Sequence, residues 1–430
     1  YVLAAGLVLL ALVAPSQAAT LDVGAGRTYS TIQAAVNAAQ AGDAIVVYPG
    51  TYNEQVNLPN GFGGGATTPI IIRAALPARQ PLSGGAWASA PADRSIINGG
   101  GVRSYGFYNN AQTALASAVR NVVIDGFYFQ DQINSALYFI DDPDIWVRNN
   151  MFVGAGGTGD DDSAIETNYT ACTGWLIQNN YFESTSTRQT SAIGMNSPGS
   201  IVEFNHIKIA GTGDRRAFYY HSGSNNSVIR HNFIEFTIST ALAWRFRDHV
   251  GDSFTHNFVK VAAGVTPAIF VWHENVQNNL NEAHIISYNT SLVLGNAGDA
   301  GLFHLGFQNN ITANYNIFVG PTSGNPIYAF DEGWTGQAAG SGTMDHTVIH
   351  RLTGVRDPVL TGYTATNTQV VDPQVNAATG CAAGVDNAVY GANLSVSSIP
   401  YRKCDGSLYP FASKFGLGTP PTSPTGVTVN

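Results

Sequence analysis

The sequence predicts an all-β chain wound into a parallel β-helix, a stack of coils in which each coil contributes three short strands. Two interleaved ladders of similar segments carry this prediction. In the first ladder an asparagine stands between two short β runs, at Asn150, Asn180, Asn205, Asn232, Asn257, Asn289 and Asn316. In the second ladder an Ala or Gly precedes a large apolar residue, at Leu137, Ile165, Ile193, Phe218, Leu242, Ile269 and Leu302. Because one coil cannot bury its own apolar face, such repeats must stack.

The two ladders have different expected roles. Asparagine tolerates left-handed backbone and can stack its side-chain amide on the next coil, so the first ladder should serve the fold. The large apolar residues of the second ladder should form one inward, buried column.

Residues 1–18 have the pattern of a secretory signal, incomplete at its start, with an apolar run over residues 2–14 and a small-x-small site at Ser16-Gln17-Ala18. A membrane anchor is the alternative, but this run is shorter than the about 20 residues that a span needs. The signal predicts a secreted protein, extracellular or periplasmic.

Residues 19–335 are the predicted β-helix, and its first part should cap the stack. Ile32, Ala35, Val36 and Ala39 have helical spacing, and Ser30 with Gln33 matches a capping box. A short helix there would cover the open end of the stack. Residues 336–418 read as an irregular C-terminal cap, and residues 419–430 as a Pro/Thr-rich tail or linker.

The composition argues against one class of binding partner. The net charge of −9 is not what a general nucleic-acid binder would carry. Cys381 and Cys404 could form a disulfide in an oxidising compartment, whereas Cys172 reads as a small buried hydrophobe. We expect a monomer.

A family resemblance supports the same fold. The segment "GRTYSTIQAAVNAAQAGDAIVVYPGTYNEQV" and the asparagine ladder together resemble the pectate-lyase-like superfamily of right-handed parallel β-helices, over roughly residues 20–335. The resemblance implies the fold rather than one activity, because that superfamily includes polysaccharide lyases, hydrolases, epimerases, phage tail proteins and adhesins.

The candidate site lies on the outward positions of the second ladder. There the middle coils present polar residues that are unusual for a β surface, namely Glu166, Asn168, Asn196, Tyr219, His221, Arg245 and Arg247. Adjacent coils are about 4.8 Å apart, so Tyr219 and His221 should neighbour the two arginines in a groove. Aromatic residues at Tyr138, Phe270 and Trp272 could act as sugar platforms. The alternative is ordinary surface pairing, with Arg247 beside Asp248 or Glu274 and Arg245 covering Trp272.

These residue types suit β-elimination on a uronic-acid polysaccharide. An arginine, Arg245 or Arg247, can bind the substrate carboxylate in bidentate geometry. His221 or Tyr219 can act as base and acid, and the family resemblance implies that Arg245 could itself take the proton. A two-carboxylate hydrolase and a non-catalytic, adhesive glycan-binding protein are the alternatives.

A calcium site is a further possibility. Asp160, Asp161, Asp162 and Glu166 form a compact group of oxygen ligands, of the kind that Ca²⁺ binds, although a solvated acidic turn has the same pattern. Glu166 is three coils, about 14 Å, from Arg245, which argues against a calcium-neutralised mechanism at the arginines.

Overall fold

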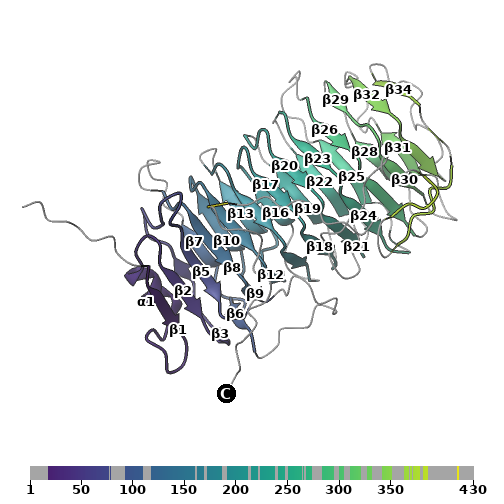
Figure 1. Cartoon of the computed structure of the whole chain (residues 1–430). Coiled ribbons are helices and arrows are strands. Elements are labelled where there is room, and N and C mark those ends of the chain that lie inside the picture. Colours follow the sequence, from purple (N-terminus) through teal and green to yellow (C-terminus); the bar gives the residue numbers. More distant parts are fainter. Residues whose placement is uncertain are drawn as a thin grey trace, which may run out of the picture.

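The structure is a computed structural model, and it describes residues 18–76, 78, 93–109, 118–159, 162–168, 172–185, 191–211, 215–220, 223–237, 241–246, 250–263, 265, 268–273, 283–294, 300–304, 310–320, 327–331, 341–350, 363–367, 369, 371–377, 381–385 and 414–415. In these ranges the chain forms a parallel β-helix with one short helix at its N-terminal end (Figure 1). The predicted fold class is confirmed.

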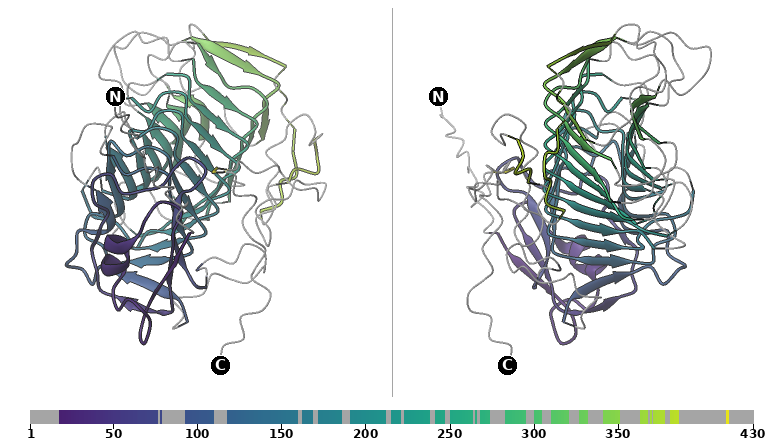
Figure 2. Two further views of the ribbon diagram at one scale, coloured as in Figure 1. Left: turned by 60° about the vertical axis from the view of Figure 1, so that its left-hand side comes forward. Right: turned by 90° about the vertical axis from the view of Figure 1, so that its right-hand side faces the viewer.

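Three parallel sheets run the length of the stack, and each coil passes through sheets C, A and B in turn (Figure 2). Sheet A contains β1 (Thr20–Val23), β2 (Ala44–Val47), β5 (Ile70–Ala74), β8 (Val122–Asp125), β11 (Ile145–Arg148), β14 (Leu176–Gln178), β17 (Ile201–Glu203), β20 (Val228–Arg230), β23 (Ser253–Thr255), β26 (Ile285–Ser287), β29 (Ile311–Thr312), β32 (Gly342–Asp345) and β34 (Tyr363–Thr366). Sheet B contains β3 (Gly50–Tyr52), β6 (Ser95–Asn98), β9 (Tyr128–Gln130), β12 (Met151–Val153), β15 (Tyr181–Glu183), β18 (His206–Ile209), β21 (Phe233–Phe236), β24 (Phe258–Val261), β27 (Thr290–Val293), β30 (Ile317–Val319) and β33 (Val348–His350). Sheet C contains β4 (Val56–Asn57), β7 (Tyr105–Asn109), β10 (Ser135–Ile140), β13 (Ser163–Asn168), β16 (Ser191–Met195), β19 (Arg215–Tyr220), β22 (Ala241–Phe246), β25 (Ala268–His273), β28 (Ala300–His304) and β31 (Ile327–Asp331).

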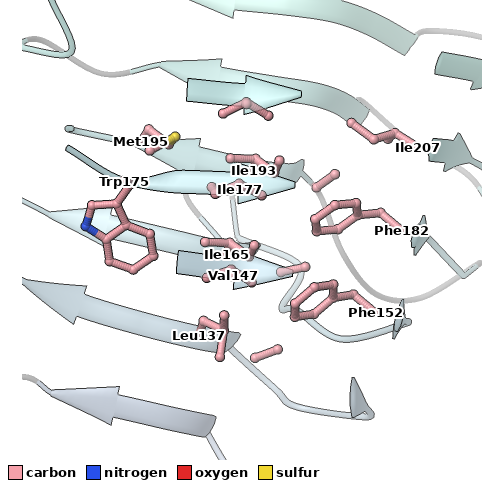
Figure 3. Close-up of a cluster of buried hydrophobic side chains, with 14 of the residues drawn as sticks. Leu137, Val147, Phe152, Ile165, Trp175, Ile177, Phe182, Ile193, Met195 and Ile207 are labelled. Atoms are coloured by element: carbon pink, nitrogen blue, oxygen red, sulfur yellow. The ribbon is translucent and has the colours of Figure 1, made fainter. Parts of the chain in front are cut away.

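The core is a set of apolar columns inside the coils (Figure 3). Leu137, Ile165 and Ile193 of sheet C stand in register, and all three are fully buried. On sheet B, Phe152 and Phe182 stack with their ring centroids 4.8 Å apart. Each coil therefore buries its apolar residues against its neighbours above and below, as the repeat pattern predicts.

The predicted inward column is correct for four coils and wrong from the fifth. Phe218 pairs with Trp244 and not with Leu242, because β22 is shifted by two residues. Later coils follow the shift, so Leu242 pairs with Ile269 outside this column. The "Ala then large" pattern occurs twice in this strand, and the fold uses the second copy, which places the fully buried Trp244 in the core.

The asparagine ladder forms one hydrogen-bonded column, as predicted. Each ladder side chain accepts from the backbone N–H of the preceding ladder residue, as Asn180 does from Asn150 at 3.0 Å. Its amide group donates to the next ladder oxygen, as Asn180 does to Asn205 at 3.0 Å. The left-handed residue is not the ladder asparagine itself but the residue before it, for example Asn179 with a φ of 53°.

Residues just before the ladder asparagines form a second stack, made of rings. The rings of His231, His256, Tyr288 and Tyr315 follow one another at centroid distances of 5.0, 4.8 and 5.0 Å. The stack begins at Phe204 and ends at His346. Every member has a positive φ, so the shared backbone conformation aligns the rings.

The N-terminal cap matches the prediction except at its first residue. Helix α1 (Ile32–Ala38) buries Ile32, Ala35 and Val36 against the end of the stack. Thr31 is the N-cap and its side chain accepts from Ala34 N–H, so the predicted capping box at Ser30 is wrong. Glu54 accepts the N–H groups of Ile32 and Gln33, which satisfies two further helix donors.

The C-terminal region extends the stack beyond the predicted boundary at residue 335. Strands β32, β33 and β34 add to sheets A and B as far as Thr366. The chain later returns to the early coils, where Lys414 Nζ lies 2.7 Å from Asp144 Oδ1 and Phe415 packs against the apolar cluster of Val123, Trp146 and Leu176.

Outcomes at the remaining predicted features are mixed. Cys172 is fully buried and free. Cys381 is disulfide-bonded, but Cys404 lies outside the described residues, so their pairing stays a prediction. Residues 1–17 also lie outside them, and within the described residues no helix is long and apolar enough to cross a membrane.

Candidate functional site on the outer face of sheet C

Two columns of side chains point outward from the middle of sheet C. In each coil a buried Ala and a large apolar residue belong to the core, such as Ala136 and Leu137. The residues on either side of this pair share the outer face, because Ser135 Oγ contacts the Glu166 carboxylate of the next coil. The residue before the pair forms the first outward column: Ser135, Ser163, Ser191 and Arg216. The residue after it forms the second outward column: Tyr138, Glu166, Gly194, Tyr219 and Arg245.

Two guanidinium groups lie close to the ring of Tyr219. The guanidinium carbon of Arg216 is 4.7 Å from the centroid of the Tyr219 ring, and that of Arg245 is 4.9 Å from it. Arg216 and Tyr219 belong to β19, and Arg245 belongs to the adjacent strand β22, where it pairs in register with Tyr219. The geometry is that of cation–π contacts, which hold the two cations close to one phenol.

The two-residue shift in β22 pairs Tyr219 in register with Arg245, whereas His221 lies outside the described residues. Arg245 is buried, with only 8% of its surface accessible. Arg216, fully buried, was missed; the signal that could have found it is its place before Ala217, equivalent to Ser135, Ser163 and Ser191.

Glu166 is fixed by neighbours on both of its oxygens. Ser135 Oγ donates to Glu166 Oε2 at 2.7 Å, and Asn168 Nδ2 donates to Oε1 at 3.0 Å. Asn168 also reaches the hydroxyl of Tyr138 at 3.1 Å. Tyr138 in turn stacks on Tyr105, with ring centroids 4.7 Å apart. The predicted residues Tyr138, Glu166 and Asn168 therefore form one connected group.

Gly194 separates Glu166 from Tyr219 in the second outward column. A Cβ at this position would overlap the hydroxyl of Ser163. Ser163 and Ser191 are both fully buried, and within the described part of the chain neither hydroxyl has a hydrogen-bond partner. Asn196, also predicted for the site, is half-buried, and its backbone N–H donates to Thr167 Oγ1 at 3.0 Å.

The other predicted residues cannot be placed in the site. His221, Arg247, Asp160 and Asp161 lie outside the described residues. Phe270 and Trp272 belong to β25, and the register pairs Trp272 with Arg245, but their side chains are not described.

The described acids do not by themselves fit a calcium ion. Both oxygens of Glu166 accept hydrogen bonds from side chains, and Asp162 Oδ2 accepts the N–H of Gly159 at 2.6 Å within its own turn. Among the described residues no cluster of three or more His, Cys, Asp or Glu side chains could hold a metal ion. We therefore derive no chemical step through calcium.

Comparison with known proteins finds no matching family model and no similar curated protein. Among solved structures, the tailspike protein of E. coli bacteriophage HK620 in complex with a pentasaccharide aligns with a TM-score of 0.50 at 12% identity, covering 78% of this chain and 61% of the tailspike. A surface adhesin of Streptococcus pneumoniae aligns at 0.47 and 13% identity, over 75% of this chain and 85% of the adhesin. A PL6 family polysaccharide lyase from Pseudopedobacter saltans aligns at 0.42 and 13% identity, over 82% and 92%. The shared feature is the fold: this chain is a parallel β-helix protein.

Proposed function

We propose that the protein cleaves an acidic, uronic-acid polysaccharide by β-elimination on the outer face of sheet C. The observation that carries the proposal is the group of Arg216, Tyr219 and Arg245, in which two guanidinium carbons lie within 5 Å of one phenol ring. Groups suited to carboxylate binding and to proton transfer are thereby available at one place.

The reaction has three chemical requirements. The sugar carboxylate must be neutralised so that the proton on the neighbouring carbon becomes acidic. A base must then remove that proton, and an acid must protonate the oxygen of the leaving sugar. Arg245 and Arg216 suit the first role, because guanidinium groups bind carboxylates in bidentate geometry and remain charged.

Tyr219 suits the proton transfers. Its hydroxyl can both accept and donate a proton, and its ring lies close to the two arginines that would bind the carboxylate. His221, two residues further along the chain, remains the other candidate for this role. Glu166, fixed by Ser135 and Asn168, suits an acceptor for a sugar hydroxyl on the N-terminal side of the group.

One observation favours hydrolysis as a second candidate. Burial raises the pKa of Tyr105, and the carboxylates of Glu166 and Asp162 raise it further. A pair of carboxylates is what glycoside hydrolysis uses. In that case the arginines would bind substrate and the acids would carry the chemistry.

The products discriminate between the candidates. A panel of acidic polysaccharides is incubated with the protein, and ultraviolet absorbance reports unsaturated ends while a reducing-sugar assay reports every new chain end. β-Elimination yields both signals, hydrolysis only the second, and an adhesive protein binds without either. Binding without new ends across the panel would refute both enzymatic proposals.

Arg245→Met tests the site itself, because methionine keeps most of the apolar volume and removes the charge. We expect the activity to fall by more than about a hundredfold, since carboxylate neutralisation acts mainly in the transition state. Arg148→Met is the matched control: Arg148 is also buried and lies over an aromatic ring, Trp146 at 4.2 Å, but on sheet A. Equal loss of activity in both variants would place the chemistry elsewhere.

Secretion belongs to the same proposal. The disulfide at Cys381 supports it, because disulfides persist in oxidising compartments. Mass spectrometry of the protein recovered from the medium should find a chain that begins after Ala18.

A further inference from the structure

The turn between β10 and β11 contains a buried aspartic acid directly before a proline. Asp142 and Pro143 lie between Asp141 and Asp144, two residues with left-handed backbone at φ values of 57° and 59°. Asp142 has no accessible surface, and its Oδ2 accepts no hydrogen bond from any described residue. A buried carboxyl oxygen without a partner is rare in folded proteins, so its presence asks for a physical reason.

The contacts of Asp142 fix both its side chain and its peptide group. Its Oδ1 accepts the N–H of Val119 at 2.7 Å, and its own backbone N–H donates to Cys172 Sγ at 3.3 Å. Its carbonyl oxygen, which belongs to the peptide bond with Pro143, accepts Trp175 Nε1–H at 2.8 Å. A fixed donor of this kind stabilises the negative charge that develops on a carbonyl oxygen when its carbon is attacked.

The carboxyl group of Asp142 also keeps its proton at an unusual pH. Burial raises its pKa to about 7 and the charge of Asp141 adds to this effect, whereas two nearby backbone N–H groups and the charge of Arg120 oppose it. Burial raises the pKa of the neighbouring Cys172 thiol to about 12, so that group stays neutral. The Asp142 carboxyl is therefore protonated in the folded chain where an exposed aspartate is ionised.

We propose that the folded chain cleaves its own peptide bond between Asp142 and Pro143. A carboxyl oxygen of Asp142 attacks the carbonyl carbon of the same residue, and a cyclic anhydride of the succinic type forms as the C–N bond to Pro143 breaks. The carboxyl proton passes to the proline nitrogen, which leaves as a secondary amine. Water then opens the anhydride, so the net change is hydrolysis of one peptide bond.

The fold supplies what an exposed Asp-Pro pair lacks. The nucleophile and its target are held in one geometry, the nucleophile brings the proton that the leaving nitrogen needs, and Trp175 polarises the carbonyl group. Asp372-Pro373 is the contrast within the described residues. The side chain of Asp372 is 52% exposed, and its Oδ1 accepts the N–H of Gln374 at 2.9 Å.

The cut chain should remain in one folded particle. On one side of the cut, β10 pairs with β7 and β13, and on the other side β11 pairs with β8 and β14. Lys414 Nζ of the returning C-terminal chain lies 2.7 Å from Asp144 Oδ1, directly after the new N-terminus at Pro143. The cut is therefore visible in a denaturing gel while gel filtration shows an unchanged particle.

The test uses the full chain, purified at about pH 8, moved to about pH 5.5 and sampled over several days by denaturing gel and mass spectrometry. We expect one cut, giving a fragment that ends at Asp142, and hydroxylamine should convert that end to a hydroxamate. At about pH 5.5 the carboxyl of a chain unfolded in urea is ionised, so the unfolded chain should be cut at least about tenfold more slowly. No cut, an equal rate in urea, or equal cutting at Asp372-Pro373 would overturn the inference.

Four variants test the assigned groups, and thermal unfolding checks that each is folded. Asp142→Asn and Pro143→Ala should abolish the cut, because the first removes the acid and the second the basic leaving nitrogen, whereas Asp372→Asn should leave it unchanged. Trp175→Phe keeps a ring beside Phe139 and removes only the donor, so the cut should be about a hundredfold slower. A turn that is merely loosened would be cut faster, so an unchanged or faster cut in Trp175→Phe would contradict the mechanism.

Discussion

Replacing a middle member of the asparagine ladder should destabilise the β-helix far more than an ordinary surface change. Asn232→Ala is the most informative variant, because Asn232 has ladder neighbours on both sides. Its Oδ1 accepts from the backbone N–H and the side-chain amide of Asn205, each at 3.0 Å. Its Nδ2 donates to Val202 O at 2.9 Å, to Arg230 O at 3.0 Å and to Asn257 Oδ1 at 3.0 Å.

The magnitude follows from what alanine leaves behind. The N–H of Asn205, in a residue only 2% exposed, loses its acceptor, and the amides of the two neighbouring ladder residues each lose one contact. An unsatisfied buried donor costs about 1–3 kcal/mol, and each lost hydrogen bond about 1 kcal/mol, so we expect about 3–5 kcal/mol in total. A loss of this size is exceptional for a single substitution.

The assay is urea unfolding followed by circular dichroism, with hydrogen exchange of the peptide that contains Asn205 as a local readout. Asn37→Ala is the control, because Asn37 is an exposed asparagine in helix α1 and its change should stay within about 0.5 kcal/mol. Asn232→Asp should destabilise at least as much as alanine, since it keeps the acceptor but places a second, charged oxygen against the three acceptors of Nδ2. If Asn232→Ala unfolds at the same urea concentration as Asn37→Ala, the ladder does not stabilise the fold as argued.

Four further variants test other parts of the molecule. Burial, and to a smaller extent the charge of Arg230, lowers the pKa of His256 to about 4, so the unfolded chain binds the proton before the folded chain does. Stability that is present above about pH 6.5 should therefore fall by up to about 3 kcal/mol as the pH drops toward 4. His256→Phe keeps a ring in the stack and should flatten this decline in urea unfolding; an unchanged slope would assign it to other groups. Burial raises the pKa of Asp142 to about 7, so the folded chain binds the proton before the unfolded chain does, and stability should fall as the pH rises from about 4 to 7. The stability of Asp142→Asn relative to the parent protein should therefore be higher at pH 8 than at pH 5. The opposite sign would contradict the burial argument. Phe415→Ala should lower stability by about 1–2 kcal/mol and Lys414→Ala by less than about 1 kcal/mol, because the first removes apolar packing on Trp146 and the second a part-exposed ion pair; the reverse order would show that charge holds this segment.

The sequence predicted the fold because its two ladders repeat residue types that the fold needs at fixed places. An asparagine that must bridge two coils cannot be exchanged for another residue without leaving a buried donor unpaired, so Asn150 through Asn316 stand out in the chain. The ring stack beside it was not found, because left-handed backbone accepts Phe204, His231 and Tyr288 alike and no single residue type marks the position.

A second polar ladder also escaped detection, at the turn between sheets C and A. Asp142 N–H donates to Cys172 Sγ at 3.3 Å, Ser197 N–H to Ser224 Oγ at 3.2 Å, and Asp252 N–H to His284 Nδ1 at 3.2 Å. Each contact requires only an acceptor of suitable size, and three different residue types, Cys, Ser and His, supply it. The same kind of hydrogen bond recurs in successive coils at this turn, but the residue types that make it differ, so no periodic sequence pattern predicts the ladder.

The candidate site was predicted in its residue types but not in its register. Arg245 and Tyr219 were singled out as polar residues on an otherwise apolar strand, and they do meet. Their direct pairing depends on which of two Ala residues, Ala241 or Ala243, enters the core, and this is decided by how Trp244 packs on Phe254, at 5.3 Å between ring centroids. Such a choice depends on the volume available in the neighbouring coil, which a local pattern does not contain.

The distribution of charge over sheets A and B bears on the proposal that the ligand binds on sheet C. On sheet B the outward charges alternate along the stack and pair between coils, as Lys208 does with Glu183 at 2.6 Å and Lys260 with Glu235 at 3.0 Å. On sheet A, Arg148 pairs with Asp125 and Arg230 with Glu203, each at 2.8 Å. Apolar outer patches of both sheets are covered by the returning C-terminal chain. In these two sheets, within the described residues, the outward groups therefore satisfy one another and stabilise the stack. In the middle of sheet C the corresponding positions carry serines, a glycine, one tyrosine and two arginines near its ring, and these are the positions that the proposed function assigns to the anionic sugar.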